Sequence, residues 1–344
     1  MELYKNRRLH MDYSKYIEEY LIRPDSKFQG EGKYFHYTSL ESCINMLKHT
    51  DGEFEIWASH LSFLNDKEEL INGMKLIDRK VEDLLLSKGD TLSDWIEEYQ
   101  EGRMNEDNLL DDIYVVCFCS KRSLLSQWKY YGKNSGIAIE YNLDFCEYSG
   151  YIASNIPFKN MNQEYLPNYV NKVIYDNMEK QEIIDAFIKE HIYKIYNSDA
   201  EQSDIEKKRC IYRQMDKLYS LAPLFKHDSF QEENESRLLF FPLSIKGCET
   251  GKLVNYRSSD GKIVPYMKIK IRGRMEGTKR ESVIKSLTVG PGQNQDLIFE
   301  ALKHLVINKF PKKNSRFQMI QRKDYSYVNV NGIEIRKVST PFRG

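Results

Sequence analysis

The stretch IYVVCFC at residues 113–119 is a continuous apolar run, and it decides the fold class. A short run without charged residues is typical of a strand that is covered on both faces. Shorter stretches that favour strands flank it at 33–37, 54–58 and 136–141. The run therefore predicts the central strand of a sheet, with the other strands arranged around it.

Helix signals separate these strands. A Thr-x-x-Glu capping box at 38–41 predicts a helix to about residue 48. Asn65 or Asp66 is a natural N-cap for a second helix, which should run to about residue 87. The polar residues 89–110 are helical or loose, and 120–131 offers a further helix.

The sequence pattern changes twice in the second half of the chain, first to helical spacing and then to strands. Apolar residues recur at helical spacing through 160–222, which predicts a helical insertion in the sheet-based core. After residue 235, strands dominate, and an amphipathic helix is expected over 296–310. An Asn331-Gly332 pair predicts a tight hairpin between two late strands. Further strands are expected at 237–241, 266–272, 286–289, 327–330 and 333–338.

These patterns predict an α+β fold with a mixed or antiparallel central sheet, flanking helices and the helical insertion. We expect a helical lead-in at 1–32, followed by a single domain over 33–343.

Composition narrows the functional class. The 344 residues are 41% hydrophobic and 30% charged, which suits a folded core. No run approaches the roughly 18 apolar residues of a membrane span, and the N-terminus lacks an apolar signal stretch. The six cysteines do not form the dense framework of a small secreted domain. We therefore expect a cytoplasmic protein with reduced thiols and no membrane partner.

Charge is unevenly distributed along the chain. Residues 246–344 carry 21 Lys and Arg against 8 Asp and Glu, a net of +13, so the rest carries −13 because the total is zero. Such asymmetry can indicate a nucleic-acid or phosphate partner. The alternative is that the basic part packs on the acidic part or faces solvent.

The first candidate site residues are His36, Tyr37 and Thr38, at the end of a predicted strand. A histidine there can hold a ligand hydroxyl, and the N-terminus of the following helix attracts anions. The alternative is a core histidine beside a structural cap.

A second group follows the apolar run. Ser120 stands at its end, and Trp128 and Tyr131 lie on the next predicted helix, where their rings could line a pocket. Capping by Ser120 and core packing by Trp128 are the alternatives.

The third group opens a late strand. Glu233, Glu235 and Arg237 are two apart, so on a strand they would share one face, with Lys226 a little earlier in the chain. A charged row is costly to bury unpaired. It is therefore either a solvated edge or the lining of a polar cleft, where carboxylates could stabilise a cationic transition state.

Other motifs predict little chemistry. Cys117-x-Cys119 has no second Cys or His pair nearby, and no phosphate-binding lysine loop or His-Glu-x-x-His motif is present, so we expect no metal. Asn65-Asp66-x-x-Glu69 could supply oxygen ligands, but its spacing favours a helix cap.

The ordered set of motifs resembles the bacterial family called domain of unknown function 2971 (DUF2971). The matching pieces are His36-Tyr37-Thr38-Ser39, Ala58-Ser59, Leu64-Asn65-Asp66-x-x-Glu69, Cys117-Phe118-Cys119-Ser120, Trp128-x-x-Tyr131, Gly136-Ile137-Ala138-Ile139, Phe225-Lys226, Glu233-x-Glu235-x-Arg237, Val289-Gly290-Pro291 and Ser339-Thr340-Pro341-Phe342-Arg343.

A looser resemblance joins the chain to ADP-ribosyltransferases. It implies that His36 holds a ribose of NAD, that Ser120 or Tyr131 lies by the nicotinamide, and that Glu235 positions the ribose, with Glu233 as its substitute. Lys226 and Arg237 could then bind phosphates or brace the glutamates.

Three functions follow as alternatives. The first is an ADP-ribosyltransferase-like enzyme that uses or cleaves NAD and acts as a toxin or a phage-defence effector. The second is a nucleic-acid-binding or metal-dependent nuclease-like protein, which would use the basic segment 246–344 and the carboxylates of Asp66, Glu69, Glu233 and Glu235. The third is a non-catalytic protein that binds a partner protein.

Overall fold

The fold was analysed in a computed structural model of the chain. The structure describes residues 32–48, 53–64, 68–86, 90–105, 113–132, 136–143, 146–149, 170–198, 203–240, 254–259, 261–273, 275–276, 279–280, 282–309, 317–322 and 325–338. The expected lead-in at 1–31, the cap at Asn65 or Asp66 and the ending at 339–343 lie outside these residues.

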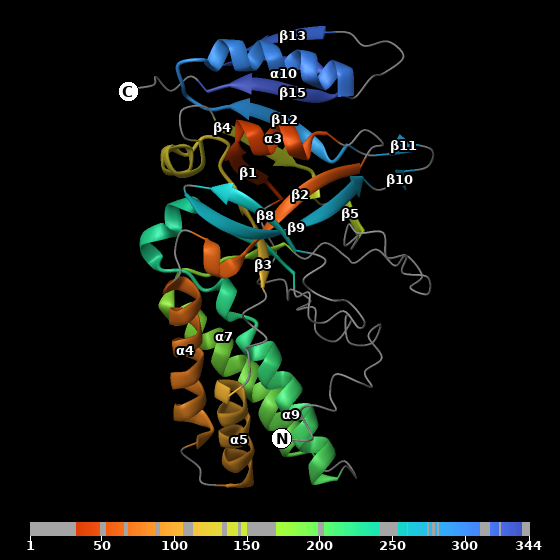
Figure 1. Cartoon of the computed structure of the whole chain (residues 1–344). Coiled ribbons are helices and arrows are strands. Elements are labelled where there is room, and N and C mark those ends of the chain that lie inside the picture. Colours follow the sequence, from red (N-terminus) through yellow and green to blue (C-terminus); the bar gives the residue numbers. More distant parts are fainter. Residues whose placement is uncertain are drawn as a thin grey trace.

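A large mixed sheet forms one end of the molecule (Figure 1). Among the described residues it has 13 strands, in the order β13-β14-β15-β12-β4-β1-β3-β2-β9-β5, with β7 beside β3, β6 beside β7 and β8 beside β9. Neighbours are antiparallel except β12 and β15, which are parallel. The strands are β1 (Tyr34–Ser39), β2 (Glu53–His60), β3 (Tyr114–Cys119), β4 (Gly136–Tyr141), β5 (Cys146–Ser149), β6 (Asn171–Lys172), β7 (Glu235–Phe240), β8 (Val254–Ser259), β9 (Lys262–Gly273), β12 (Ile284–Val289), β13 (Phe317–Arg322), β14 (Tyr325–Val330) and β15 (Ile333–Lys337), with a separate pair β10 (Met275–Glu276) and β11 (Lys279–Arg280).

Helices occupy two places. Four of them, α4, α5, α7 and α9, lie together at the end opposite the sheet, while α3 and α10 lie against the sheet itself (Figure 1). The helices are α3 (Leu40–Met46), η3 (Leu61–Phe63), α4 (Glu68–Leu84), α5 (Thr91–Asn105), α6 (Leu125–Gln127), η5 (Trp128–Gly132), α7 (Asn177–Phe187), η7 (Ile188–Tyr193), α8 (Lys194–Tyr196), α9 (Asp204–Tyr219), η8 (Ala222–Leu224), η9 (Asp228–Glu233) and α10 (Gln295–Lys309).

The α+β class with a mixed sheet and flanking helices is confirmed. Two local predictions were wrong. The cap of α3 is Ser39, whose hydroxyl accepts from the Ser42 amide, while Thr38 belongs to β1 and is buried. The helix expected over 120–131 begins only at Leu125, because 120–124 form an irregular connection after β3.

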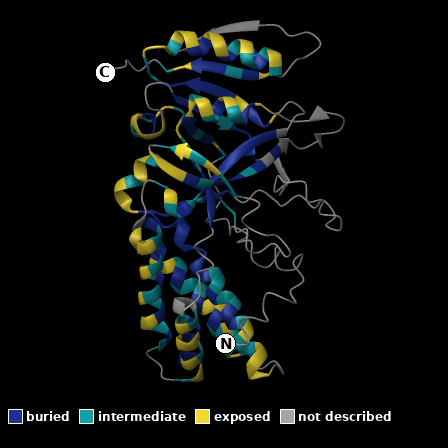
Figure 2. Ribbon diagram, in the orientation of Figure 1, coloured by how far each residue is buried: buried dark blue, intermediate teal, exposed yellow. Residues whose placement is uncertain are grey.

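Two main apolar cores hold these layers together, and Figure 2 shows the buried strands and inner helix faces in dark blue. The first lies between the sheet and α3 and α10, and includes Met46 and Leu302. The second fills the four-helix end and includes Val81, Ile96 and Ile211. Helices α7 and α9 therefore share a core with α4 and α5, which come from a different part of the chain.

The sheet splits beside β3. Strand β1 pairs with β3 only at Phe35–Cys119, and β2 pairs with it only at Ser59–Val115 and His60–Tyr114. On its other side, β3 pairs with β7 along its whole length. Between the two short contacts, the edge of β3 faces no described strand. This split positions the cavity described next.

Candidate functional site

A cavity of about 930 Å³ opens where β1 and β2 separate from β3. Its walls come from distant parts of the sequence: β1, β2, β3, β7, β8, the start of α4 and the segment between α9 and β7. Its volume lies within the roughly 300–1,000 Å³ of small-molecule sites in proteins. Eight of the ten predicted site residues line it: His36, Tyr37, Thr38, Tyr131, Lys226, Glu233, Glu235 and Arg237.

His36 is anchored at the split. Its Nδ1 lies 3.0 Å from the carbonyl oxygen of Cys117, on the part of β3 that no described strand covers. Because a carbonyl oxygen only accepts, Nδ1 must carry the hydrogen. Burial lowers the pKa of His36 to about 4, so the ring is neutral at pH 7 and its Nε2 is an acceptor.

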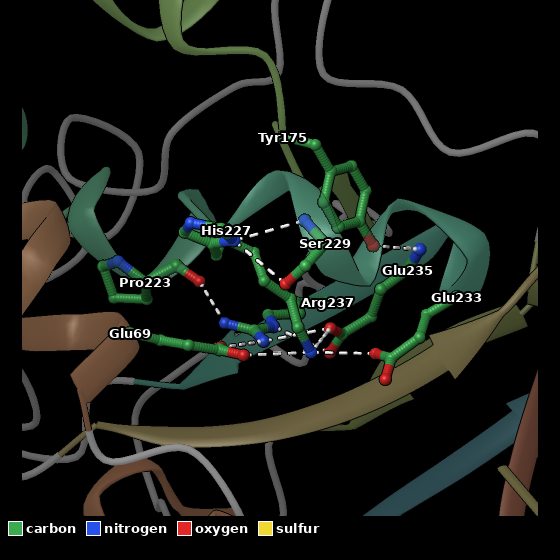
Figure 3. A network of polar contacts seen from close by, with 9 residues as sticks. Glu69, Tyr175, Pro223, His227, Ser229, Glu233, Glu235 and Arg237 are labelled. Atoms are coloured by element: carbon green, nitrogen blue, oxygen red, sulfur yellow. Dashed lines mark hydrogen bonds and ion pairs between the residues drawn. The ribbon is translucent and has the colours of Figure 1, made fainter. Parts of the chain in front are cut away.

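Two cations and three carboxylates form a buried cluster on one side of the cavity (Figure 3). Arg237 binds Glu235 through Nε at 2.8 Å and Glu69 through Nη2 at 2.7 Å. Lys226 lies within 3.0 Å of the carboxylates of Glu69, Glu233 and Glu235. The formal charge of the cluster is two positive against three negative, so it is −1.

The two glutamates differ in how they are held. Both oxygens of Glu235 are bound, Oε1 by Arg237 and Oε2 by Arg237 and Lys226. Burial alone would raise the pKa of Glu235, but the charges of Arg237 and Lys226 lower it to about 2. Glu233 contacts Lys226 through Oε2 only, and burial raises its pKa. Glu235 is therefore a fixed anion, whereas Glu233 is better suited to exchange a proton.

The predicted charged row on one strand was wrong in one member. Only Glu235 and Arg237 lie on β7. Glu233 ends the short helix η9, and Asn234 between them adopts a left-handed conformation with φ 41°. The turn returns the Glu233 carboxylate to the cluster through Lys226 rather than through strand alternation.

Tyr131 and Cys117 border the same cluster. Although 37% of Tyr131 is exposed, burial of its phenol, then the neighbouring Cys117 and Glu235, raise the pKa of that phenol, which stays protonated. The Cys117 thiol donates to the Glu235 carboxylate, and burial raises the pKa of that thiol as well. Both groups are therefore hydrogen-bond donors at neutral pH.

Tyr37 has a structural partner. Its hydroxyl donates to the Lys121 carbonyl at 2.8 Å and accepts from the Leu124 amide at 3.0 Å, so it fixes the connection after β3. Its ring meets that of Trp128 edge-on at 4.6 Å.

Ser120 and Trp128 do not line the cavity. The Ser120 hydroxyl accepts from the side chain of Asn234 at 2.7 Å and so supports the turn before β7. Trp128 is buried against Gly290, where an added Cβ would come within 2.6 Å of its ring. Of the two alternatives for the second site role, the structure brings Tyr131, not Ser120, to the cavity.

Sequence reasoning missed several residues that line the cavity or support its lining. Glu69 was interpreted as a cap partner, yet it binds both cations of the cluster. The Tyr175 hydroxyl accepts from the Glu235 amide at 2.9 Å and holds the start of β7. Trp57 and Arg257 also line the cavity. The alternation of residue types along β2 could have indicated Trp57, but no pattern in the sequence around Arg257 indicated that residue.

Among the described residues, no group of three or more His, Cys, Asp and Glu side chains is arranged to hold a metal ion. In the same residues, no helix is long and apolar enough to cross a bilayer.

The unfolding free energy should depend on the protonation of His36. Its folded pKa of about 4 is below the ordinary 6.5, so an unfolded chain binds the proton more readily. The contribution of the neutral ring to the unfolding free energy is therefore fully present above pH 6.5 and is lost as the pH falls towards 4. Because the ring borders the cavity, we expect a loss of about 1–2 kcal/mol rather than the full value.

Urea unfolding at pH 7 and pH 4.5 measures this loss, with His36→Asn as the control. Asparagine can still donate to the Cys117 carbonyl but does not titrate. The variant should lose about 1–2 kcal/mol less than the wild type over this range. Equal losses in the two proteins would contradict the assignment of the buried, neutral ring.

Comparison with known proteins identifies one family. Residues 127–238 match the family model described as "Protein of unknown function (DUF2971)", which confirms the predicted resemblance over this segment. The segment carries Tyr131, Lys226, Glu233, Glu235 and Arg237, whereas His36 precedes it. No match was found among curated proteins or among solved structures.

Proposed function

We propose that the cavity, which the segment matching DUF2971 lines in part, binds NAD, and that the protein cleaves the bond between the nicotinamide and the ribose of NAD. One observation carries this proposal. His36, Tyr131 and the pair Glu233 and Glu235, which are far apart in the sequence, line one cavity of a volume suited to a small molecule.

The neutral histidine supplies the contact with a ribose. Its Nε2 is an acceptor because Nδ1 is bound to Cys117. A ribose hydroxyl that donates to Nε2 would be held beside β3, in the cavity that the carboxylates also line. The Tyr131 phenol, which stays protonated, could donate to the nicotinamide amide or stack against its ring.

The charge of the cluster suits the reaction. When the glycosidic bond of NAD breaks, its electron pair moves to the nicotinamide nitrogen, and positive charge develops at ribose C1′. A buried cluster with formal charge −1 stabilises that charge in a site shielded from water. Glu235, ionised and held on both oxygens, supplies the fixed negative charge, and Lys226 and Arg237 hold it in place.

Glu233 completes the step. The oxygen of a water molecule or another acceptor bonds to C1′, and the acceptor's proton passes to Glu233, whose Oε1 is not bound to Lys226. With water, the products are nicotinamide, ADP-ribose and a proton. With another acceptor, ADP-ribose is transferred, and the basic segment 246–344 makes nucleic acid the first acceptor class to test.

Incubation of the purified protein with NAD tests this proposal. Chromatography should detect nicotinamide released in a time- and enzyme-dependent manner, and calorimetry should detect NAD binding. Free ADP-ribose would indicate hydrolysis, whereas label retained on an added nucleic acid would indicate transfer. Glu300→Gln, an exposed change on α10, is the control for the variants. Folded protein that neither binds NAD nor releases nicotinamide would refute the proposal.

A further inference from the structure

Arg257 lines the cavity from β8, which β9, β2 and β3 separate from the ion cluster at β7 in the order of the sheet. It lies on β8, directly across from Val264 of β9, so both side chains project from one face of the sheet. On that face, its guanidinium lies 5.6 Å from the ring centres of both Trp57 and Tyr266. The two rings form a tilted pair with centres 4.6 Å apart. The aromatic platform fixes the position of the cation.

The hydrogen bonds of Arg257 are incomplete. Its Nη2 donates to the Ser59 hydroxyl at 2.8 Å, and its Nε is buried without a partner. A guanidinium has five N–H donors, and each prefers an acceptor. Within the described part of the chain, no carboxylate forms an ion pair with Arg257.

The other cations of the cavity differ in this respect. Lys226 contacts three carboxylates, and Arg237 contacts two. A half-buried cation without a counterion is unfavourable unless an anion from outside the chain joins it. The carboxylates of the cavity are therefore largely paired with cations, whereas the positive charge of Arg257 is not paired with a carboxylate among the described residues.

Arg257 is also near His36. Its positive charge is one of the causes that lower the pKa of the His36 imidazole, after burial. Because both residues line the same cavity, a ligand that donates a hydroxyl to His36 could place an anionic group against Arg257.

We propose that Arg257 binds a phosphate group of the ligand. Its unbound N–H groups, on a guanidinium centred 5.6 Å from the rings of Trp57 and Tyr266, could donate in pairs to two phosphate oxygens. This inference deepens the proposed function, because NAD carries a diphosphate between its two ribosyl groups, and it rests on that function only for the identity of the ligand.

Calorimetric titration with ADP and with adenosine tests the phosphate contact directly. The wild-type protein should bind ADP at least about 10-fold more tightly than adenosine. Arg257→Gln should weaken ADP binding about 10- to 100-fold and leave adenosine binding unchanged. Lys262→Gln is the matched control, since it removes one exposed positive charge from the same hairpin outside the cavity and should change neither affinity.

Folding is checked by thermal denaturation, and Arg257→Lys provides a second variant. Lysine keeps the charge but not the paired donors, so it should recover part of the preference for ADP. Equal wild-type affinity for ADP and adenosine, or ADP binding that is unchanged in folded Arg257→Gln, would overturn the inference.

The two proposals can fail separately. ADP binding that depends on Arg257, without nicotinamide release from NAD, would sustain the phosphate site and refute the cleavage of NAD. Conversely, NAD cleavage with the same KM in the wild type and Arg257→Gln would sustain the proposed function and refute the role of Arg257.

Discussion

Replacing Arg237 with alanine is expected to lower the free energy of unfolding by about 3–5 kcal/mol. Arg237 is 1% exposed. It donates to Glu235, to Glu69 and to the Pro223 carbonyl, so one side chain joins β7, α4 and η8. Its removal leaves three carboxylates around Lys226 alone, in an environment that water reaches poorly.

Urea unfolding followed by circular dichroism measures the loss. The control is Lys337→Ala, which breaks the exposed ion pair with Asp296 and should cost less than about 1 kcal/mol. The comparison separates a buried, shared cation from a surface ion pair. If the two variants lost similar stability, the cluster would not support the fold in the way that its geometry indicates.

Local signals were sufficient where the structure depends on local chemistry. The apolar run 113–119 contains the central strand β3, and both faces of that strand are buried: Val116 and Phe118 pack in the first core, and Val115 packs in the second. The hairpin turn predicted at Asn331-Gly332 is also present, with φ of 55° and 94° at the two residues. Such turns require positive φ, which asparagine and glycine tolerate best.

Predictions failed where two residues offer the same chemistry. Thr38 and Ser39 can both cap a helix and both pair with β4, but Thr38 is buried, whereas Ser39 is exposed at the end of β1 and directly precedes α3. Glu233 and Glu235 share a face on an ideal strand, but the left-handed Asn234 places Glu233 outside β7. In both cases, the residue at which the strand begins or ends settled the choice.

The place of Arg257 in the cavity could not be predicted from the sequence for a related reason. Arg257 reaches the cavity because β8 pairs with β9, and β9 pairs with β2, which carries Trp57 and Ser59. The sequence within a few residues of Arg257 gives no indication of this order of strands. Glu69 is similar, since its partner Arg237 is 168 residues away in the sequence.

Replacing Glu233 with glutamine is expected to slow NAD cleavage by about 10²–10³-fold, because the variant cannot accept the acceptor's proton. Its stability should change by no more than about 1 kcal/mol, since Lys226 keeps the carboxylates of Glu69 and Glu235. Nicotinamide release under saturating NAD measures the rate. The control is Glu232→Gln, which removes the exposed neighbouring carboxylate and should retain the wild-type rate.

Glu235→Gln is expected to reduce stability as well as activity, so it distinguishes the fixed anion Glu235 from the proton acceptor Glu233. Its carboxylate binds Arg237 through both oxygens, so glutamine should reduce stability by about 3 kcal/mol as well as activity. A proton acceptor can be removed without unfolding the site, whereas a fixed anion between two cations cannot. If Glu233→Gln kept full activity while a folded Glu235→Gln lost it, the proton would have to pass to Glu235, despite its pKa of about 2. The assignment of the two glutamates would then be reversed.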